Sequence, residues 1–343
     1  MAIDVFCHIY PNEYLRAIKE LCKGISFKTD SQSGAVTIFN ENLNTWVGFF
    51  KKDSHCTTPE LRLKHMDRYG IDTQVLTVAL PGLEPTMLGA TAESTSKIAK
   101  ISNDTMSKIV DKHRGRFIGV AEIPILKEEE ALDEVDRALN DLGLGAIQLY
   151  TQMGGITLDS KKLFALYEKI LKYDVPILVH PSNPLPGEYR SYERDFLLYY
   201  IFGWTYETTL AFSRVVFSDL LVRFPKLKFI SHHMGGSISF FGSRIQLYEQ
   251  EAVTEKRRTT KEYLRDFKTI HHDTAVFGNV PAVRCGYDFF GSKQLLFATD
   301  YPFGPEYGVV FLRDTLKSIE ALNLPENDKE RILEGNARKI FKM

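Results

Sequence analysis

The chain has little cysteine and no surplus of either charge. Its 343 residues include four cysteines, and 43 Lys and Arg stand against 44 Asp and Glu, for a formal net charge of −1. No two cysteines form a C-x-x-C pair, which excludes a zinc ribbon and a thioredoxin-type motif. The balanced charge argues against nucleic-acid binding by phosphate neutralisation and against a polybasic membrane anchor. We therefore predict neither nucleic acid nor membrane as a partner.

Targeting and membrane-spanning signals are also missing. The opening segment MAIDVFCHIYPNEY has no basic stretch followed by an apolar one, so it does not read as a secretory signal. The longest apolar run, FLLYYIFGWTY at 196–206, is too short to cross a bilayer. We expect a reduced, cytoplasmic protein.

What the sequence does contain is a recurring pair: a short apolar run followed by a helical pattern. Eight strand-like runs lie at 2–9, 73–80, 117–124, 145–150, 175–180, 227–233, 267–273 and 294–300. Helical patterns lie between them at 91–113, 128–142, 160–173, 191–224 and 327–341, and another begins at Thr58. Mainly apolar strands are typical of a parallel sheet covered on both faces.

This alternation favours the α/β class and a (β/α)8 TIM barrel, with residues 1–343 forming one domain. The alternative is an open doubly wound sheet. That fold usually carries a Gly-rich phosphate loop after its first strand, whereas strand one here leads into His8 and Pro11. Residues 22–57 contain Gly, Ser, Thr and Asn clusters with short strand-like pieces and are predicted to form a long inserted loop after strand one, over the active face.

Titratable residues gather at the ends of the predicted strands, which meet at one face of a barrel. Six of the nine histidines lie there, and so do two aspartates: His8, His180, His232, His233, His271, His272, Asp273 and Asp300. Neutral imidazoles with a carboxylate are the usual ligands of zinc and similar metals. Each histidine also has a structural alternative, a buried ring bonded to backbone. Asp300 ends an apolar strand and must be paired or bind a metal.

The remaining histidines carry weaker signals. His232 alternates with His233 along the strand, which favours an orientation toward the barrel wall. The roles of His271 and His272 stay open. Three further histidines, His55, His65 and His113, lie in loop or helix patterns and are expected to be solvated.

Seven short motifs in order suggest a family. They are I-D-V-x-x-H-I-x-P at 3–11, P-E-L-R-x-x-x-M-D-x-x-G-I-D at 59–72, V-H-P at 179–181, F-P-K-L-K at 224–228, H-M-G-G at 233–236, T-D-Y-P-F-G at 299–304 and G-N-A-R at 335–338. With them the chain resembles the amidohydrolase superfamily, in the branch of aminocarboxymuconate-semialdehyde decarboxylase and the metal-dependent aromatic-acid decarboxylases. The resemblance covers nearly the whole chain.

The resemblance implies roles for particular residues. His8, His180 and Asp300 match metal ligands, which implies one divalent metal ion per chain, zinc first and manganese as the alternative. His233 matches a proton-transferring histidine, with Asp300 as the second catalytic group. Arg244 matches an arginine that reaches a substrate carboxylate in the neighbouring subunit, which implies a homodimer or higher oligomer; its alternative is a surface ion pair. Phe303 and Trp204 are predicted substrate contacts.

One position departs from the family pattern. The first strand of the family reads H-x-H or begins with glutamate, but Phe6 stands at that first position here. Phenylalanine cannot bind a metal, so a metal-free enzyme stays open. Cys7 is a poor substitute, because neighbouring residues on a strand point to opposite faces. Three protein ligands still suffice for an open catalytic site.

The leading hypothesis is a carbon–carbon lyase, a non-oxidative decarboxylase of a hydroxybenzoate-type or semialdehyde carboxylic acid. A metal would bind the small acid, and His233 or Asp300 would deliver a proton. The alternative is a hydrolase of a lactone or amide on the same barrel, with a hydratase as a third reading. A non-catalytic barrel that lost its metal through Phe6 is a fourth.

Overall fold

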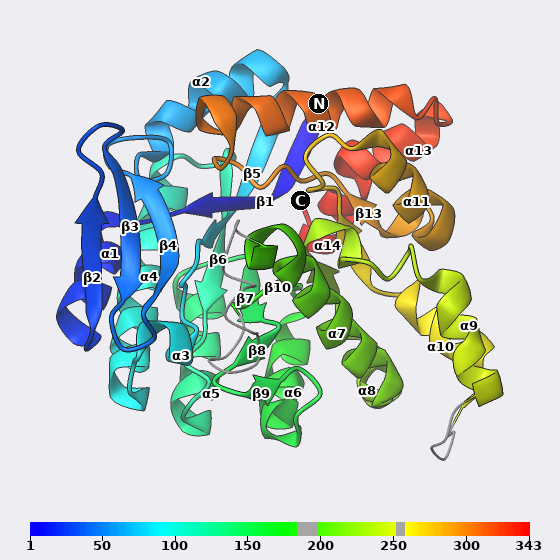
Figure 1. Ribbon diagram of the computed structural model, residues 1–343, viewed down its shortest axis with the longest axis horizontal. Helices are drawn as coiled ribbons and strands as arrows, with labels where there is room; N and C mark the ends of the chain where they lie inside the picture. The colour runs from blue at the N-terminus through cyan, green and yellow to red at the C-terminus, as the bar shows by residue number, and fades with distance from the viewer. Residues whose placement is uncertain (184–197, 252–257) are drawn as a thin grey trace.

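The computed structural model describes residues 1–183, 198–251 and 258–343. Its main sheet has eight parallel strands whose spatial order follows the chain (Figure 1): β1 (Ala2–Ile9), β5 (Ile71–Val78), β6 (Phe117–Glu122), β7 (Ala146–Tyr150), β10 (Ile177–His180), β11 (Phe229–Ser231), β12 (His271–Asp273) and β13 (Leu295–Leu296). A doubly wound sheet reverses its order partway, and this sheet does not. The barrel prediction is confirmed.

The barrel is closed between its first and last strands by hydrogen bonds. The amide of Val5 donates to the carbonyl of Phe297 at 2.9 Å. The buried carboxylate of Asp4 accepts the amide of Thr299 at 3.0 Å and its hydroxyl at 2.6 Å. These contacts hold the segment after β13 against β1, although β13 itself is shorter than the predicted strand 294–300.

Helices surround the barrel (Figure 1). The described α-helices are α1 (Asn12–Leu21), α2 (Pro59–Tyr69), α3 (Pro85–Leu88), α4 (Ala92–Lys112), α5 (Glu128–Asp136), α6 (Phe164–Tyr173), α7 (Trp204–Phe217), α8 (Leu220–Arg223), α9 (Gly242–Glu251), α10 (Thr260–Phe267), α11 (Val280–Phe290), α12 (Val309–Ala321), α13 (Glu326–Glu330) and α14 (Asn336–Phe341). Three π-helical turns, η1 (Arg137–Asp141), η4 (Tyr199–Gly203) and η8 (Arg331–Gly335), continue such helices. Within the described ranges, no helix is both long and apolar enough to cross a bilayer.

Most predicted helices are present, with different ends. α2 begins at Pro59 after Thr58 and stops at Gly70, which adopts the left-handed conformation that suits glycine. The pattern at 327–341 is divided among α13, η8 and α14. Of the predicted segment 191–224, residues 191–197 lie outside the described residues, and so do the first two residues of the apolar run 196–206.

The segment 22–57 is inserted after the first strand, as predicted, but its strand-like pieces pair into a regular sheet rather than a loop. It forms an antiparallel sheet of β2 (Ile25–Thr29), β3 (Ala35–Asn40) and β4 (Thr45–Lys51), which stands beside the barrel in Figure 1. Alternating burial along β3 lets one face of this sheet pack into the core, through Ile38 and Val47 among others. A smaller hairpin, β8 (Gln152–Met153) and β9 (Ile156–Thr157), follows β7.

The buried apolar residues form two clusters. The smaller one takes residues from seven of the eight barrel strands, including Phe6, Val75, Leu178 and Leu296, and so fills the barrel interior. The larger one lies between the strands and the surrounding helices. A β-bulge between Asp4 and Cys7 interrupts the pairing of β1 with β5 just before His8.

Candidate active site

The carboxyl ends of the strands bring four histidines and one aspartate together. His8 is the last but one residue of β1, His180 ends β10, His232 and His233 follow β11, and Asp300 lies four residues after β13. Ligand atoms of His8, His180 and His232 lie within 4.8 Å of one another, and those of His232, His233 and Asp300 do the same. His8 Nε2 is 2.9 Å from Asp300 Oδ1. All five residues are buried.

Three of these rings are anchored through Nδ1. His8 Nδ1 is 2.8 Å from the hydroxyl of Thr77, which itself donates to the carbonyl of Cys7. His180 Nδ1 donates to the carbonyl of Pro181 at 2.7 Å, and His232 Nδ1 pairs with the carboxylate of Asp273. These partners place the proton on Nδ1 and leave the lone pair on Nε2, the arrangement that outer-shell groups impose on metal-binding histidines.

The protonation states suit a cation. Burial lowers the pKa of His8 and takes the pKa of His180 well below its usual range. Burial opposes ionisation of Asp300, but the nearby imidazoles of His232, His233 and His8 outweigh it and hold the pKa of this carboxyl well below the usual range. When His8 carries its proton on Nδ1, its Nε2 and the ionised Asp300 Oδ1, 2.9 Å apart, offer two neighbouring lone pairs to a cation.

His232 and His233 differ in electrostatics. Burial by itself lowers the pKa of His232, but the charge and hydrogen bond of Asp273, helped by Asp300, raise it to about 9, so at neutral pH its Nε2 also carries a proton until a cation displaces it. Burial lowers the pKa of His233, and its Nε2 lies 3.8 Å from Asp300 Oδ2. His233 is thus a neutral base or a transient acid beside a carboxylate.

The prediction that His232 faces the barrel wall is wrong. Strand β11 ends at Ser231, and the chain then makes a 3-10 turn in which His233 and Met234 have φ near +55°. The alternation of a strand stops there, so both neighbouring rings face the site, with centroids 3.8 Å apart. The sequence feature that could have indicated this is the His232-His233 pair directly before Met-Gly-Gly, because glycines there end the strand.

Gly236 is required for packing at this turn. In the structure, Gly236 has φ +66°, and a Cβ there would lie 2.2 Å from the carbonyl oxygen of Thr205. The close approach is to α7, whose start forms one side of the pocket described next.

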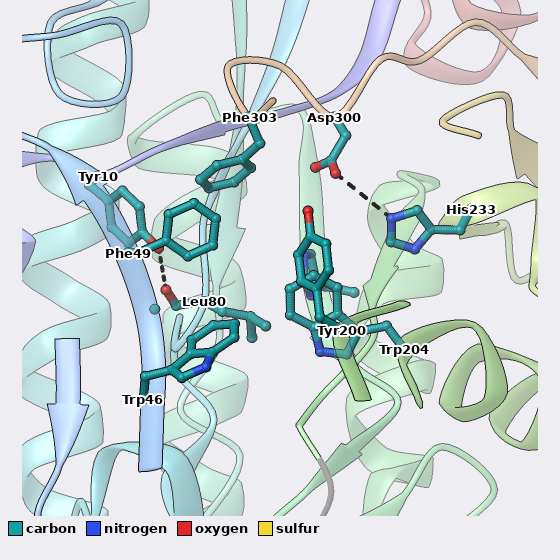
Figure 2. Close-up of a pocket in the computed structure, with 11 residues that line it drawn as sticks. Tyr10, Trp46, Phe49, Leu80, Tyr200, Trp204, His233, Asp300 and Phe303 are labelled. Atoms are coloured by element: carbon teal, nitrogen blue, oxygen red, sulfur yellow. Dashed lines mark hydrogen bonds and ion pairs between the residues drawn. The ribbon is translucent and has the colours of Figure 1, made fainter. Parts of the chain in front are cut away.

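The site opens into a pocket of about 370 Å³ (Figure 2). Figure 2 shows aromatic rings on two sides of the space, with Asp300 and His233 at one end. The lining residues are Tyr10, Trp46, Gly48, Phe49, Leu80, His180, Tyr200, Trp204, His233, Asp300 and Phe303. Both predicted substrate contacts, Trp204 and Phe303, are among them. None of these lining residues is lysine or arginine.

Several predicted positions lie outside the pocket. Arg244 is exposed on α9 and does not line it. The Cys7 thiol lies against the backbone oxygen of Asp4, in the outer cluster, as the alternation predicted. His272 packs on Phe290 and contacts Ser231, away from the pocket lining.

The expectation of solvated helix and loop histidines is also corrected, because all three are half-buried. His55 and His65 stack with centroids 4.4 Å apart, and His65 Nδ1 lies 2.9 Å from the hydroxyl of Tyr301. His113 pairs with Glu60.

A barrel with imidazoles and a carboxylate at the carboxyl ends of its strands belongs to a known class of enzyme scaffolds. The Amidohydrolase family model matches residues 3–343, and the chain belongs to this family. The chain is 28% identical over 298 residues to 2-amino-3-carboxymuconate-6-semialdehyde decarboxylase of Dictyostelium discoideum, covering 84% of this chain and 78% of that protein. It is 28% identical over 303 residues to a gamma-resorcylate decarboxylase of a Polaromonas species, covering 82% and 86%. These relatives are decarboxylases.

Other similar proteins widen the comparison. A 2-keto-4-carboxy-3-hexenedioate hydratase of a Sphingobium species is 26% identical over 256 residues, covering 71% of each chain. The crystal structure of 5-carboxyvanillate decarboxylase from Sphingomonas paucimobilis superposes with a TM-score of 0.79 at 21% identity, covering 100% of this chain and 99% of that one. A dihydroxybenzoic acid decarboxylase from a Polaromonas species, solved with manganese and 2-nitroresorcinol, gives a TM-score of 0.78 at 22% identity, covering 99% and 96%.

Proposed function

We propose that the protein is a metal-dependent, non-oxidative decarboxylase of a small hydroxylated aromatic carboxylic acid. The observation that carries the proposal is the combination in one pocket of a buried imidazole–carboxylate set at one end and aromatic walls along the sides. The kinship with decarboxylases supports the same reaction class. A metal-free site fits poorly, because the buried His232 Nε2 has no hydrogen-bond partner among the residues that the structure describes.

The donor set holds the reacting end of the substrate. When bound by His8, His180 and Asp300, a divalent ion supplies charge stabilisation for a carboxylate and a neighbouring hydroxyl. Zinc and manganese both accept imidazole and carboxylate ligands, and manganese is the ion in the Polaromonas structure. The rings of Phe303 and Trp204 face the pocket and would flank the substrate ring, turning its carboxylate toward Asp300.

We assign the proton transfer to His233. Cleavage of the bond between the ring and the carboxylate releases CO2 and leaves the electron pair on the ring carbon, which then takes a proton. His233 lines the pocket next to Asp300, at 3.8 Å, and can give this proton and recover it from water. Asp300 stabilises the protonated imidazole.

A hydrolase or hydratase would use the same groups, with Asp300 accepting a proton from water. The hydratase among the relatives favours keeping this second function. The test incubates the metal-loaded protein in D2O with 2,6-dihydroxybenzoate and salicylate, with benzoate as the matched acid without a neighbouring hydroxyl. We expect CO2 and deuterium on the ring carbon from the hydroxylated acids only. Acid release from lactones without CO2 from any acid would refute the decarboxylase.

We also propose that the active unit is a homodimer. Arg244 is exposed and does not line the pocket of its own chain as the structure describes it, so it would reach substrate only in a neighbouring subunit. Exposed apolar side chains surround the start of α7 and the segment before α9, which touch through Ser237 and Thr209: Ile201, Phe202, Tyr206, Phe240, Phe241 and Leu247. Light scattering after size exclusion should give a dimer mass, and Arg244→Ala should raise KM. A monomer with full activity would contradict this proposal.

A further inference from the structure

We infer that His232 is a fourth protein ligand of the metal ion, in the place that Phe6 leaves without one. The inference rests on the metal dependence in the proposed function and adds a residue outside the set His8, His180 and Asp300. It makes the site a three-imidazole, one-carboxylate centre whose extra ligand comes from the end of β11 rather than from β1.

The first observation concerns the ring that His232 lies on. Phe6 is fully buried in the barrel interior, and its ring stacks on His232 with centroids 3.9 Å apart and planes 13° apart. Phe6 also lies 5.5 Å from the His8 ring and 6.0 Å from the His180 ring. The Phe6 side chain therefore lies between the three histidine rings. It offers no metal ligand, and its stacking fixes the orientation of the His232 ring.

The second observation concerns where His232 Nε2 lies. The Asp273 carboxylate takes Nδ1, so Nε2 is on the opposite side of the ring. His232 is fully buried, and its Nε2 has no hydrogen-bond partner among the described residues. It lies 3.6 Å from Asp300 Oδ1 and within 4.8 Å of the ligand atoms of His8 and His180. Ligands about 2.1 Å from one ion lie about 3.4 Å apart in a tetrahedron, so this arrangement needs only small ring movements.

The third observation is that Nδ1 of His232 is held by a hydrogen-bond partner in the same way as Nδ1 of His8 and His180. Thr77 and the carbonyl of Pro181 hold Nδ1 of His8 and His180, and Asp273 does the same for His232 with a charged group. A carboxylate on the far nitrogen orients an imidazole and makes it a stronger donor. Asp273 in turn accepts the amide of Ala275 at 3.0 Å, so it is fixed itself.

The test compares metal binding by wild type and four variants, each first checked for folding by circular dichroism. His232→Ala removes the proposed ligand, and Asp273→Asn weakens its support. His272→Ala is the matched control, since it removes another fully buried histidine from the neighbouring strand, away from the pocket. The double variant His232→Ala/Phe6→His returns a ligand from β1. Calorimetry with Mn²⁺ and Zn²⁺ measures affinity, and X-ray absorption counts imidazoles around the ion.

We expect three imidazoles in wild type and two in His232→Ala, with affinity lower by about 100-fold or more. Asp273→Asn should lose about 10- to 100-fold and keep three imidazoles. His272→Ala should match wild type, and the double variant should regain both affinity and the third imidazole.

A folded His232→Ala protein with wild-type affinity and imidazole count would overturn the inference, and so would a wild type that binds no metal. The proposed function is judged separately. Two imidazoles in an active decarboxylase would refute only the role of His232. Three imidazoles in a protein without decarboxylase activity would refute only the reaction.

Discussion

The buried carboxyl group of Asp4 makes the stability of the barrel depend on pH. We call its two hydrogen bonds with Thr299, which join the first strand to the segment after β13, the Asp4–Thr299 clasp. Burial raises the pKa of Asp4 from 3.8 to about 7, with the hydrogen bonds from Thr299 and Cys7 opposing the rise. Between pH 3.8 and about pH 7, Asp4 therefore keeps its proton in the folded protein and has lost it in the unfolded chain. The part of the unfolding free energy that comes from the protonated Asp4 is fully present below pH 3.8 and is lost as the pH rises through about 7.

The perturbation is Asp4→Asn. The amide keeps the size of the carboxylate, and the Thr299 hydroxyl can accept from its NH2 group, while the Thr299 amide donates to its oxygen. The variant therefore keeps the clasp and loses the ionisation. From the two pKa values, the wild type should lose about 2.5 kcal/mol of unfolding free energy between pH 5 and pH 8 that Asp4→Asn keeps.

Urea unfolding followed by far-UV circular dichroism at pH 5, 6, 7 and 8 measures the difference between the two proteins. Other titrating groups shift both proteins alike, so the difference isolates Asp4. Asp4→Ala is the control for the clasp itself, since it leaves two buried donors without an acceptor, at about 1–3 kcal/mol each. A difference between wild type and Asp4→Asn that stays flat across this range would refute the reasoning.

Four further predictions concern single residues. Burial raises the pKa of Glu122 to about 8, so wild type should lose stability from pH 5 to 8 relative to Glu122→Gln, as urea midpoints will report; equal slopes would contradict this. Gly236→Ala should cost about 2 kcal/mol or more, because the new methyl meets Thr205 and φ is positive; an unchanged thermal midpoint would refute it. His233→Asn should lower kcat about 10²- to 10⁴-fold without changing bound metal, and metal loss would assign His233 to the ligand set instead. Trp204→Phe should raise KM and cost about 1 kcal/mol of stability, since the Trp204 indole donates to Asn183 at 2.8 Å; unchanged KM would remove Trp204 from the substrate contacts.

The predictions from sequence succeeded where the signal was local. Apolar runs separated by helical patterns define a covered parallel sheet, and the chain order of the eight strands follows from it. The positions of His8, His180 and Asp300 at strand ends could be read directly, because every strand of a barrel ends at the same face. Trp204 and Phe303, which were predicted as substrate contacts, line the pocket, and their contact with a substrate stays a prediction.

The predictions failed where orientation depends on contacts between distant segments. The insertion 22–57 looked like a loop because its strands are short and divided by turn residues, and pairing with each other makes them a sheet. The direction of His232 depends on the end of β11 at Ser231 and on Asp273, a strand away. Neither appears in the alternation of the sequence.

The sequence by itself determined the class of fold and most of the chemical groups available to the site, because hydrophobic period and residue type are local properties. Only the tertiary structure decided which groups meet. The bulge before His8, the turn after Ser231 and the clasp that joins Asp4 to Thr299 each rotate a side chain or close a gap. They place Phe6 against His232 and bring Asp300 to His8, although these last two residues are 292 positions apart in the chain. Such contacts depend on backbone geometry and packing, which no single residue carries.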